Sequence, residues 1–280
     1  MTKAVRMMQE NIKLIDLIIE LVDARIPLSS RNPDIDELGK GKARIVLLNK
    51  SDLADPEMNK RFVRHFEKQG AHVLEINSKS GMGMKGIQGL VSEACKEKIE
   101  RDRKRGIVNR PVRAMVVGIP NVGKSTFINS FAGKACAKTG NKPGVTKGKQ
   151  WIRLNKNLEL LDTPGILWPR FEDQEVGKRL AFIGSMNDEI LIVDEMACDL
   201  IDVIAKRYPD AIEARYGFAA SEDAVKVLRQ IAESRKCYQK GENLDLEKAA
   251  AILIDDFRSG KLGRLTLEEP ESLCKENENE

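Results

Sequence analysis

The stretch GIPNVGKSTFIN, residues 118–129, decides the fold. Its first eight residues match the pattern G-x-x-x-x-G-K-[ST], with Lys124 and Ser125 in the last two places. The apolar segment Arg113–Val117 precedes it and predicts a strand, and a helical pattern over Lys124–Phe131 follows. A glycine loop before a helix presents backbone N–H groups to an anion, and the helix dipole strengthens the attraction. The stretch therefore predicts a phosphate-binding loop in an α/β protein.

The side chains of this loop have separate expected tasks. Lys124 supplies a positive charge to the β and γ phosphates of a nucleotide, and the hydroxyl of Ser125 ligates Mg²⁺. The loop backbone wraps the phosphates without interference from side chains. The loop residues predicted to contact the nucleotide are Asn121, Val122, Gly123, Lys124, Ser125 and Thr126.

A second motif, NKSD, comes far ahead of the phosphate loop and follows the apolar segment Arg44–Leu48. A carboxylate at Asp52 accepts hydrogen bonds from the N1–H and the exocyclic amine of guanine. Adenine offers neither donor there, so a buried charge would be left unpaired and the wrong base rejected. Asn49 is expected to brace the loop, while the stem of Lys50 covers the base. The residues of this motif predicted to bind guanine are Asn49, Lys50, Ser51 and Asp52.

Three further loops complete the predicted site. Asn77 and Ser78 begin the loop NSKSG, which is placed to reach the guanine carbonyl through a backbone N–H. In the sequence DTPG, Asp162 is expected to hold Mg²⁺ through a water, and the N–H of Gly165 to contact the γ phosphate. Thr146, in the glycine- and lysine-rich segment 140–149, is either a Mg²⁺ ligand or a solvated loop residue.

The base-binding motif precedes the phosphate loop, although in most proteins of this kind it follows. In a parallel α/β sheet the site forms where the carboxyl ends of several strands meet, so space and not chain order decides which loops come together. A circularly permuted chain therefore builds the same pocket. The joint is expected at the charged helix 87–105 and its connection, residues 106–111.

The pattern changes beyond about Ser185, where apolar residues recur every three to four positions and predict an all-helical region. The expected architecture is a permuted α/β nucleotide-binding domain followed by a smaller helical domain. The predicted domains are residues 1–185, a helical domain over 186–267 and an acidic tail over 268–280.

The composition bears on the partners of the protein and on its cellular compartment. The chain carries 47 Lys and Arg against 43 Asp and Glu, so net charge alone does not indicate a nucleic-acid binder. Basic residues are nevertheless concentrated in Lys96–Arg113 and Lys134–Arg153, which flank the phosphate loop. The five cysteines lack metal-ligand spacing and suit a reducing compartment. No apolar segment is long enough to cross a bilayer, so we expect no membrane partner. We also expect the protein to be monomeric and cytoplasmic.

Together these motifs resemble the circularly permuted GTPases and, more narrowly, the ribosome biogenesis GTPase A (YlqF/RbgA) family. The stretches DARIPLSSRNP, DTPGILWPRFED and DDFRSGKLGRL extend the resemblance over nearly the whole chain. The resemblance implies a permuted Ras-like P-loop domain that binds GTP or GDP with Mg²⁺. It also implies a C-terminal domain that contacts ribosomal RNA, and action in the assembly of the large ribosomal subunit.

The catalytic residues implied by the motifs are Lys124, Asn121, Thr146 and Gly165. Ile166 stands where Ras-like enzymes place the glutamine that orients the attacking water, and because an isoleucine cannot hydrogen-bond water, intrinsic hydrolysis is expected to be slow. In related GTPases the asparagine at the position of Asn121 helps hold K⁺ near the bridging phosphate oxygens. Bracing of the loop is the equal alternative.

Two main functions remain open at this point. In the first, GTP orders the loop that contains Thr146, a basic surface docks on ribosomal RNA and hydrolysis, stimulated by the ribosomal particle, triggers release. In the second, the nucleotide merely stabilises an RNA-binding module. An ATPase is a third interpretation, if the NKSD match is accidental. In the helical domain, the candidate RNA-binding residues Arg258, Lys261 and Arg264 are either phosphate contacts or a solvated rim.

Overall fold

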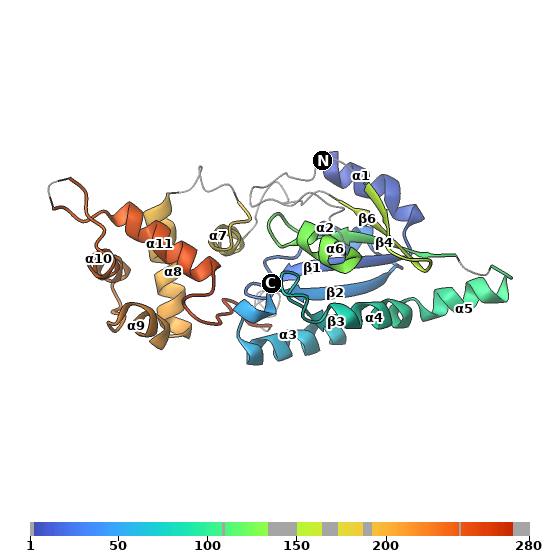
Figure 1. Ribbon diagram of the computed structural model, residues 1–280, viewed down its shortest axis with the longest axis horizontal. Coiled ribbons are helices and arrows are strands. Elements are labelled where there is room, and N and C mark those ends of the chain that lie inside the picture. The colour runs from blue at the N-terminus through green and yellow to red at the C-terminus, as the bar shows by residue number, and fades with distance from the viewer. Residues whose placement is uncertain are drawn as a thin grey trace, which may run out of the picture.

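A six-stranded sheet forms the centre of the molecule (Figure 1), in the order β3-β2-β1-β4-β6-β5. The computed structural model describes residues 3–107, 110–133, 150–163, 173–186, 192–240 and 242–270. All neighbouring strands are parallel except β5, which pairs antiparallel with β6. The strands are β1 (Leu17–Asp23), β2 (Ala43–Asn49), β3 (His72–Glu75), β4 (Val112–Val117), β5 (Gln150–Arg153) and β6 (Leu158–Asp162). The predicted α/β class is confirmed.

Helices cover both faces of the sheet. Helices α1 (Lys3–Asn11), α2 (Asp34–Leu38) and α3 (Pro56–Lys68) pack on one face, and α4 (Ile87–Ala94) and α6 (Lys124–Ala132) pack on the other. Short 3₁₀ turns occupy Ile12–Leu14, Ser51–Leu53 and Met84–Gly86. All seven residues of β1 are buried, as expected for a parallel strand covered on both sides. This burial includes two carboxylates, Glu20 and Asp23.

The expected joint of the permuted chain consists of two helices. The predicted helix 87–105 divides at Cys95 into α4 and α5 (Lys96–Lys104). Helix α5 projects from the sheet on the side away from the helical domain (Figure 1). It leads into the amino end of β4, whereas the phosphate loop follows the carboxyl end, so the basic stretch 96–113 and the phosphate loop lie at opposite ends of that strand.

Helix α3 was not predicted, although its sequence carries two signals for it. Asp55 caps the helix by accepting hydrogen bonds from Glu57 N and Met58 N, and a proline follows the cap. Met58, Phe62 and Phe66 recur every four residues and are all buried. The helical period in these residues indicates the face that packs on β2 and β3.

The helical region confirms the expected change of architecture. Helices α8 (Val193–Arg207), α10 (Ala224–Ser234) and α11 (Leu246–Arg258) pack against one another, with α9 (Asp210–Tyr216) against α8. Helix α7 (Gln174–Phe182) also packs on α8 and α11, although the boundary predicted at residue 185 assigns it to the first domain. In the described part of the chain no helix is long and apolar enough to span a membrane.

After α11 the chain returns to the sheet domain through residues 262–269, here called the return segment. Leu265 N donates to Leu53 O at 3.0 Å, and Leu267 N donates to Arg25 O at 2.8 Å. The guanidinium of Arg264 donates to Ser51 O at 3.1 Å, within the NKSD motif. The return segment therefore connects the helical domain to the predicted base-binding loop.

The predicted acidic tail, residues 268–280, begins inside this folded segment, so a tail starting at residue 268 is a prediction that needs correction. Glu268 is 2% exposed, and its carboxylate accepts hydrogen bonds from Leu28 N at 2.7 Å, from Ser29 N at 3.0 Å and from the hydroxyl of Ser29. These three donors have no other partner among the described residues, which explains why an acidic residue is buried here. Residues 271–280 lie outside the described part of the chain.

Replacing Glu268→Ala should lower the free energy of unfolding by about 1–3 kcal/mol, because it leaves buried donors of Leu28 and Ser29 unpaired. Urea denaturation measures the change. The matched control is Glu93→Ala, an exposed glutamate that should stay within about 0.5 kcal/mol of the unaltered protein. Equal stability of the two variants would contradict a structural role for the return segment.

Candidate nucleotide-binding site

The sheet brings motifs that are distant in the sequence to one edge. Because β1, β2, β4 and β6 are parallel, Asp23, Asn49, the phosphate loop and Asp162 all lie at or just beyond their carboxyl ends. The side-chain amide of Asn49 donates to Val122 O in the phosphate loop at 2.7 Å, across 73 positions of the chain. This contact joins the two motifs in spite of their inverted order.

The phosphate loop requires glycine at two positions for different steric reasons. Gly118 has φ 152°, and a Cβ there would lie 2.6 Å from Leu21 O of the neighbouring strand. Gly123 has φ 102°, and a Cβ there would lie 2.5 Å from Nδ2 of Asn49. Both distances are far below van der Waals contact. Glycine at 118 therefore lets the phosphate loop lie against β1, and glycine at 123 lets it lie against Asn49.

Lys124 begins α6 and is only 7% exposed. Its ammonium donates to Gly118 O at 2.9 Å and to Ile119 O at 2.8 Å, inside its own loop. Burial lowers the pKa of Lys124 to about 8, although the nearby charge of Asp162 raises it. A bound phosphate would therefore compete with two loop carbonyls for this ammonium.

Asp162, at the end of β6, has the features of a cation ligand. It is 2% exposed, and its Oδ1 has no hydrogen-bond partner among the described residues. Burial raises the pKa of Asp162 to about 6, although Lys124 lowers it. A bound cation would satisfy an orphaned carboxylate oxygen of this kind, so Asp162 and Ser125 fit the predicted Mg²⁺.

Other predicted metal and phosphate contacts cannot be placed. Thr146 and Gly165 lie outside the described residues, as does Ile166. Within the described ranges there is no group of three or more His, Cys, Asp or Glu that could hold a metal by itself.

The base-binding loop is braced by Asn49. Its side-chain oxygen accepts from Ser78 N at 3.0 Å and from Ser78 Oγ at 2.9 Å. The backbone N–H groups of Lys79 and Ser80 donate to Asn77 Oδ1 at 2.8 and 2.9 Å. The structure thus gives Asn77 and Ser78 the task of bracing the loop, and direct contact of either with guanine stays a prediction.

Asp52 differs from these bracing residues. It is exposed, and among the described residues no hydrogen-bond partner of its carboxylate is found. Ser51, next to it, is 1% exposed, and its hydroxyl donates to Ile76 O at 3.0 Å. The loop is therefore fixed from beneath while its carboxylate remains open to a ligand.

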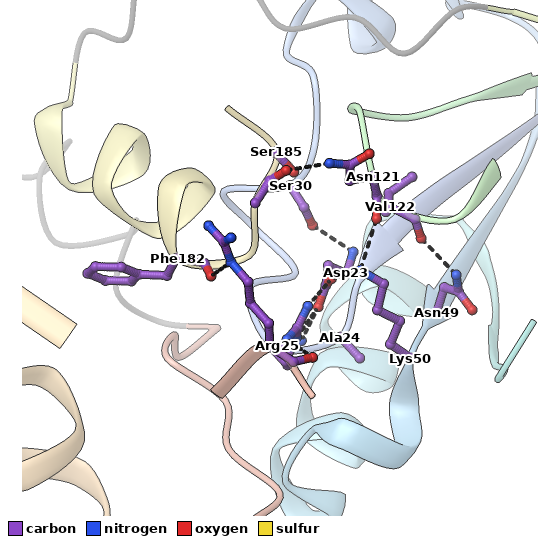
Figure 2. Close-up of polar contacts among 12 residues, drawn as sticks. Asp23, Ala24, Arg25, Ser30, Asn49, Lys50, Asn121, Val122, Phe182 and Ser185 are labelled. Atoms are coloured by element: carbon purple, nitrogen blue, oxygen red, sulfur yellow. Dashed lines mark hydrogen bonds and ion pairs between the residues drawn. The ribbon is translucent and has the colours of Figure 1, made fainter. Parts of the chain in front are cut away.

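The sequence interpretation missed Asp23 as a residue of this site. Asp23 is fully buried and accepts from Arg25 Nε and Nη2, both at 2.8 Å, and from Lys50 Nζ at 2.9 Å (Figure 2). Burial raises its pKa, but the charges of Arg25 and Lys50 outweigh that effect and hold the pKa well below the ordinary range of a carboxyl. The available signal was an Asp-x-Arg sequence at the carboxyl end of a buried strand.

The three residues predicted to bind RNA have partners within the chain. Arg258 donates to Phe182 O at 2.9 Å and to Ala181 O at 2.7 Å, while Arg264 bonds backbone carbonyls of the base-binding loop. Lys261 pairs with carboxylates of α11. The two arginines thus connect parts of the protein, and only Lys261 is both exposed and paired solely with acidic side chains.

Comparisons with known proteins agree with this arrangement. Residues 113–231 match the family described as 50S ribosome-binding GTPase. The chain is 46% identical to ribosome biogenesis GTPase A of Bacillus cereus, over all of this chain and 95% of that protein. A GDP-bound structure of Thermotoga maritima YlqF superposes with a TM-score of 0.70 at 27% identity, covering 94% of this chain and 99% of the other. A second structure of the same protein, described as GNP-bound, superposes with a TM-score of 0.66 at 28% identity. The match covers 96% of this chain and 99% of the other.

The Mg²⁺-dependent part of nucleotide affinity should fall as the pH drops below about 6. The pKa of Asp162 is raised, so its carboxyl is protonated below that pH and ligates a cation poorly. Fluorescence titration of a guanine nucleotide with and without Mg²⁺ should show a loss of up to about tenfold per pH unit. Asp162→Asn should abolish both the Mg²⁺ effect and its pH dependence. A Mg²⁺ effect that is constant across this range would contradict the assignment.

Proposed function

The chain belongs to the ribosome biogenesis GTPase A family and is a GTPase, and from this premise we propose that it acts in assembly of the large ribosomal subunit. Its intrinsic GTP hydrolysis is slow, and the ribosomal particle stimulates it. The observation that carries the proposal is the contact between Asn49 and Val122, which joins a guanine-type loop to a phosphate loop. The protein acts as a monomer that alternates between GTP and GDP.

Recognition of guanine rests on Asp52. Its carboxylate is exposed, and the NKSD loop is held by hydrogen bonds of Asn49 and Ser51. A rigid loop has little ordering entropy left to lose when the base binds, and the charged acceptor discriminates by leaving itself unpaired with adenine. The proposed contacts with guanine are those that the sequence predicts for the NKSD motif and the NSKSG loop.

In hydrolysis, Lys124 releases its loop carbonyls and neutralises charge on the β and γ phosphates. Ser125 and Asp162 would hold Mg²⁺, which would supply further positive charge to the phosphate oxygens. Thr146 and Gly165 are proposed as further residues of the site, and Asn121 would help to hold K⁺. Since Ile166 cannot orient water, a group outside these residues must do so, which is why the ribosomal particle is proposed as the activator.

Binding of ribosomal RNA is supported by a basic depression in the helical domain. Arg215, Arg235, Lys248 and Lys261 line a hollow of about 460 Å³ together with apolar residues and two aspartates of α11. The buried Asp256 fixes Arg215 through bonds of 2.8 and 3.0 Å. Fixed arginines bind phosphate at a lower entropic cost, so we extend the proposed RNA contacts from Lys261 to these neighbours. Arg258 and Arg264 are not among the residues that line this hollow, and their bonds go to the end of α7 and to the NKSD loop.

The alternative is an RNA-binding module that nucleotide merely stabilises. It is favoured by Lys124, whose ammonium is held by its own loop, and by the link from Arg264 to the base-binding loop. Nucleotide that binds this loop would thereby stabilise the helical domain without any turnover. Nucleotide-dependent RNA affinity is expected only for the switch.

Asp52→Asn should weaken GDP binding by at least about thirtyfold, because an amide places a donor against the two donors of guanine. ADP affinity should not change. Isothermal titration calorimetry measures both affinities, and Glu57→Gln, which removes an exposed charge on the neighbouring helix, is the matched control. Equal affinities for ADP and GDP in the unaltered protein would support the ATPase interpretation instead.

Turnover at saturating GTP in KCl should rise strongly, by at least about a hundredfold, when purified large ribosomal subunits are added. The rate of phosphate release is the measurement, repeated in NaCl to test the K⁺ site at Asn121. Equal rates in the two salts would count against K⁺. Binding to the particle without stimulation would favour the nucleotide-stabilised module.

A further inference from the structure

Two residues of the site have the same unusual backbone conformation. Lys50 and Asn121 both have φ 58°, in the left-handed region that residues with a Cβ rarely adopt. They contact each other directly, since Lys50 Nζ donates to Asn121 O at 2.9 Å. Strained residues persist only where the surrounding structure fixes them, so whatever holds Lys50 also contributes to the shape of the phosphate loop.

Asp23 is the group that holds Lys50. The Lys50 ammonium bonds Asp23 Oδ2 at 2.9 Å, and the carboxylate is completely buried (Figure 2). Burial lowers the pKa of Lys50, while the charge of Asp23 raises it and so favours the charged form of this ammonium. Ser30 Oγ accepts from Asp23 N at 3.0 Å and fixes the backbone from the other side.

Arg25 extends this arrangement to the helical domain. It forms a two-point bond with Asp23, while its Nη1 donates to Arg258 O at 3.3 Å. Its guanidinium also lies over the ring of Phe257, 5.2 Å from the centroid. Both partners lie in the last turn of α11, so one side chain contacts the carboxylate beneath the nucleotide loops and the end of a helix in the other domain.

A second set of contacts links the end of α11 to the phosphate loop. The Arg258 guanidinium binds the carbonyls of Ala181 and Phe182 at the end of α7. Just beyond that helix, Ser185 Oγ donates to Pro120 O at 2.8 Å, and the side-chain amide of Asn121 donates to Gly184 O. The end of α11 is therefore tied to the phosphate loop by two routes, one through Arg25 and Asp23 and one through the end of α7.

We infer that Asp23 is a positioning residue for nucleotide binding and that Arg25 couples the position of Lys50 to the end of α11. Binding of a guanine nucleotide and ordering of the α11 end then favour each other. The inference rests on the proposed function, because it assumes that Lys50 and the phosphate loop bind the nucleotide. A coupling of this kind acts in both directions.

Glu20 provides a matched control within the same strand. It is 1% exposed and pairs with two arginines, Arg44 and Arg31, much as Asp23 pairs with two cations. None of the contacts found for Glu20 involves a nucleotide loop. Glu20→Gln therefore reproduces the loss of a buried carboxylate in β1 without disturbing Lys50.

The first test compares GDP affinity in Asp23→Asn and Glu20→Gln by calorimetry, with thermal unfolding of both measured in parallel. Asp23→Asn should weaken GDP binding by about tenfold or more, while Glu20→Gln should leave it unchanged at a similar loss of stability. Equal GDP affinities in the two variants would overturn the positioning role. If Asp23→Asn does not fold, Ser30→Ala replaces it, with about threefold weaker binding expected and unchanged binding counting against the inference.

The second test addresses the coupling by hydrogen exchange at residues 258–268, each protein being measured without GDP and at saturating GDP. In the unaltered protein GDP should slow exchange there, while α10 should not respond. Arg25→Lys keeps the charge but lacks the fork that reaches Asp23 and Arg258 O together, so the slowing should disappear. Undiminished slowing in Arg25→Lys would overturn the coupling. An unaltered protein that fails to prefer GDP over ADP would instead contradict the proposed function.

Discussion

The buried carboxylate of Asp23 is the interaction on which the nucleotide loops depend. An ionised group in the interior is costly unless it is paired, and each partner of Asp23 has a second contact of its own. Lys50 also bonds the phosphate loop, and Arg25 also bonds the end of α11. Because both cations lose their shared carboxylate when Asp23 is removed, the positions of Lys50 and Arg25 both depend on it. The precise shape of two loops in one domain is thereby tied to a helix in another.

The permuted order of the chain does not alter the contacts within the site, because each contact joins loops at the same edge of the sheet. The bond from Asn49 to Val122 O does not depend on which motif is synthesised first. The permutation changes how the two halves of the sheet domain are connected. The connection between the two halves runs through α4, which packs on one face of the sheet, and then through α5, which precedes the amino end of β4. The carboxyl edge therefore stays available for ligand and for the return segment.

Much of this arrangement could be predicted from the sequence, since local patterns carry it. The glycine loop, the strand ending at Leu48 and the apolar period of the last helices predict the sheet, the main loops and the two-part architecture. The roles of Asp23, Arg258 and Arg264 were not predictable in the same way. The partners of the two arginines are backbone carbonyls remote in sequence, and a charge that binds a carbonyl inside the protein has the same local pattern as one that binds RNA. Asp23 has a local partner in Arg25, but its bond to Lys50 spans 27 positions of the chain.

The same distinction explains why a basic side chain near the end of α11 is not by itself an RNA contact. The guanidinium of Arg264 donates to the carbonyls of Ala54 and Ser51, so moving the helical domain would remove this donor from the loop that carries Asp52. Ser51 O would keep its bond from Asn59 Nδ2, but Ala54 O would lose the Arg264 donor, which is unfavourable. A partner that draws the helical domain away therefore works against the nucleotide loop, while one that holds the domain in place supports it. Hydrogen bonds that link the domains thus make the nucleotide site sensitive to what the helical domain binds.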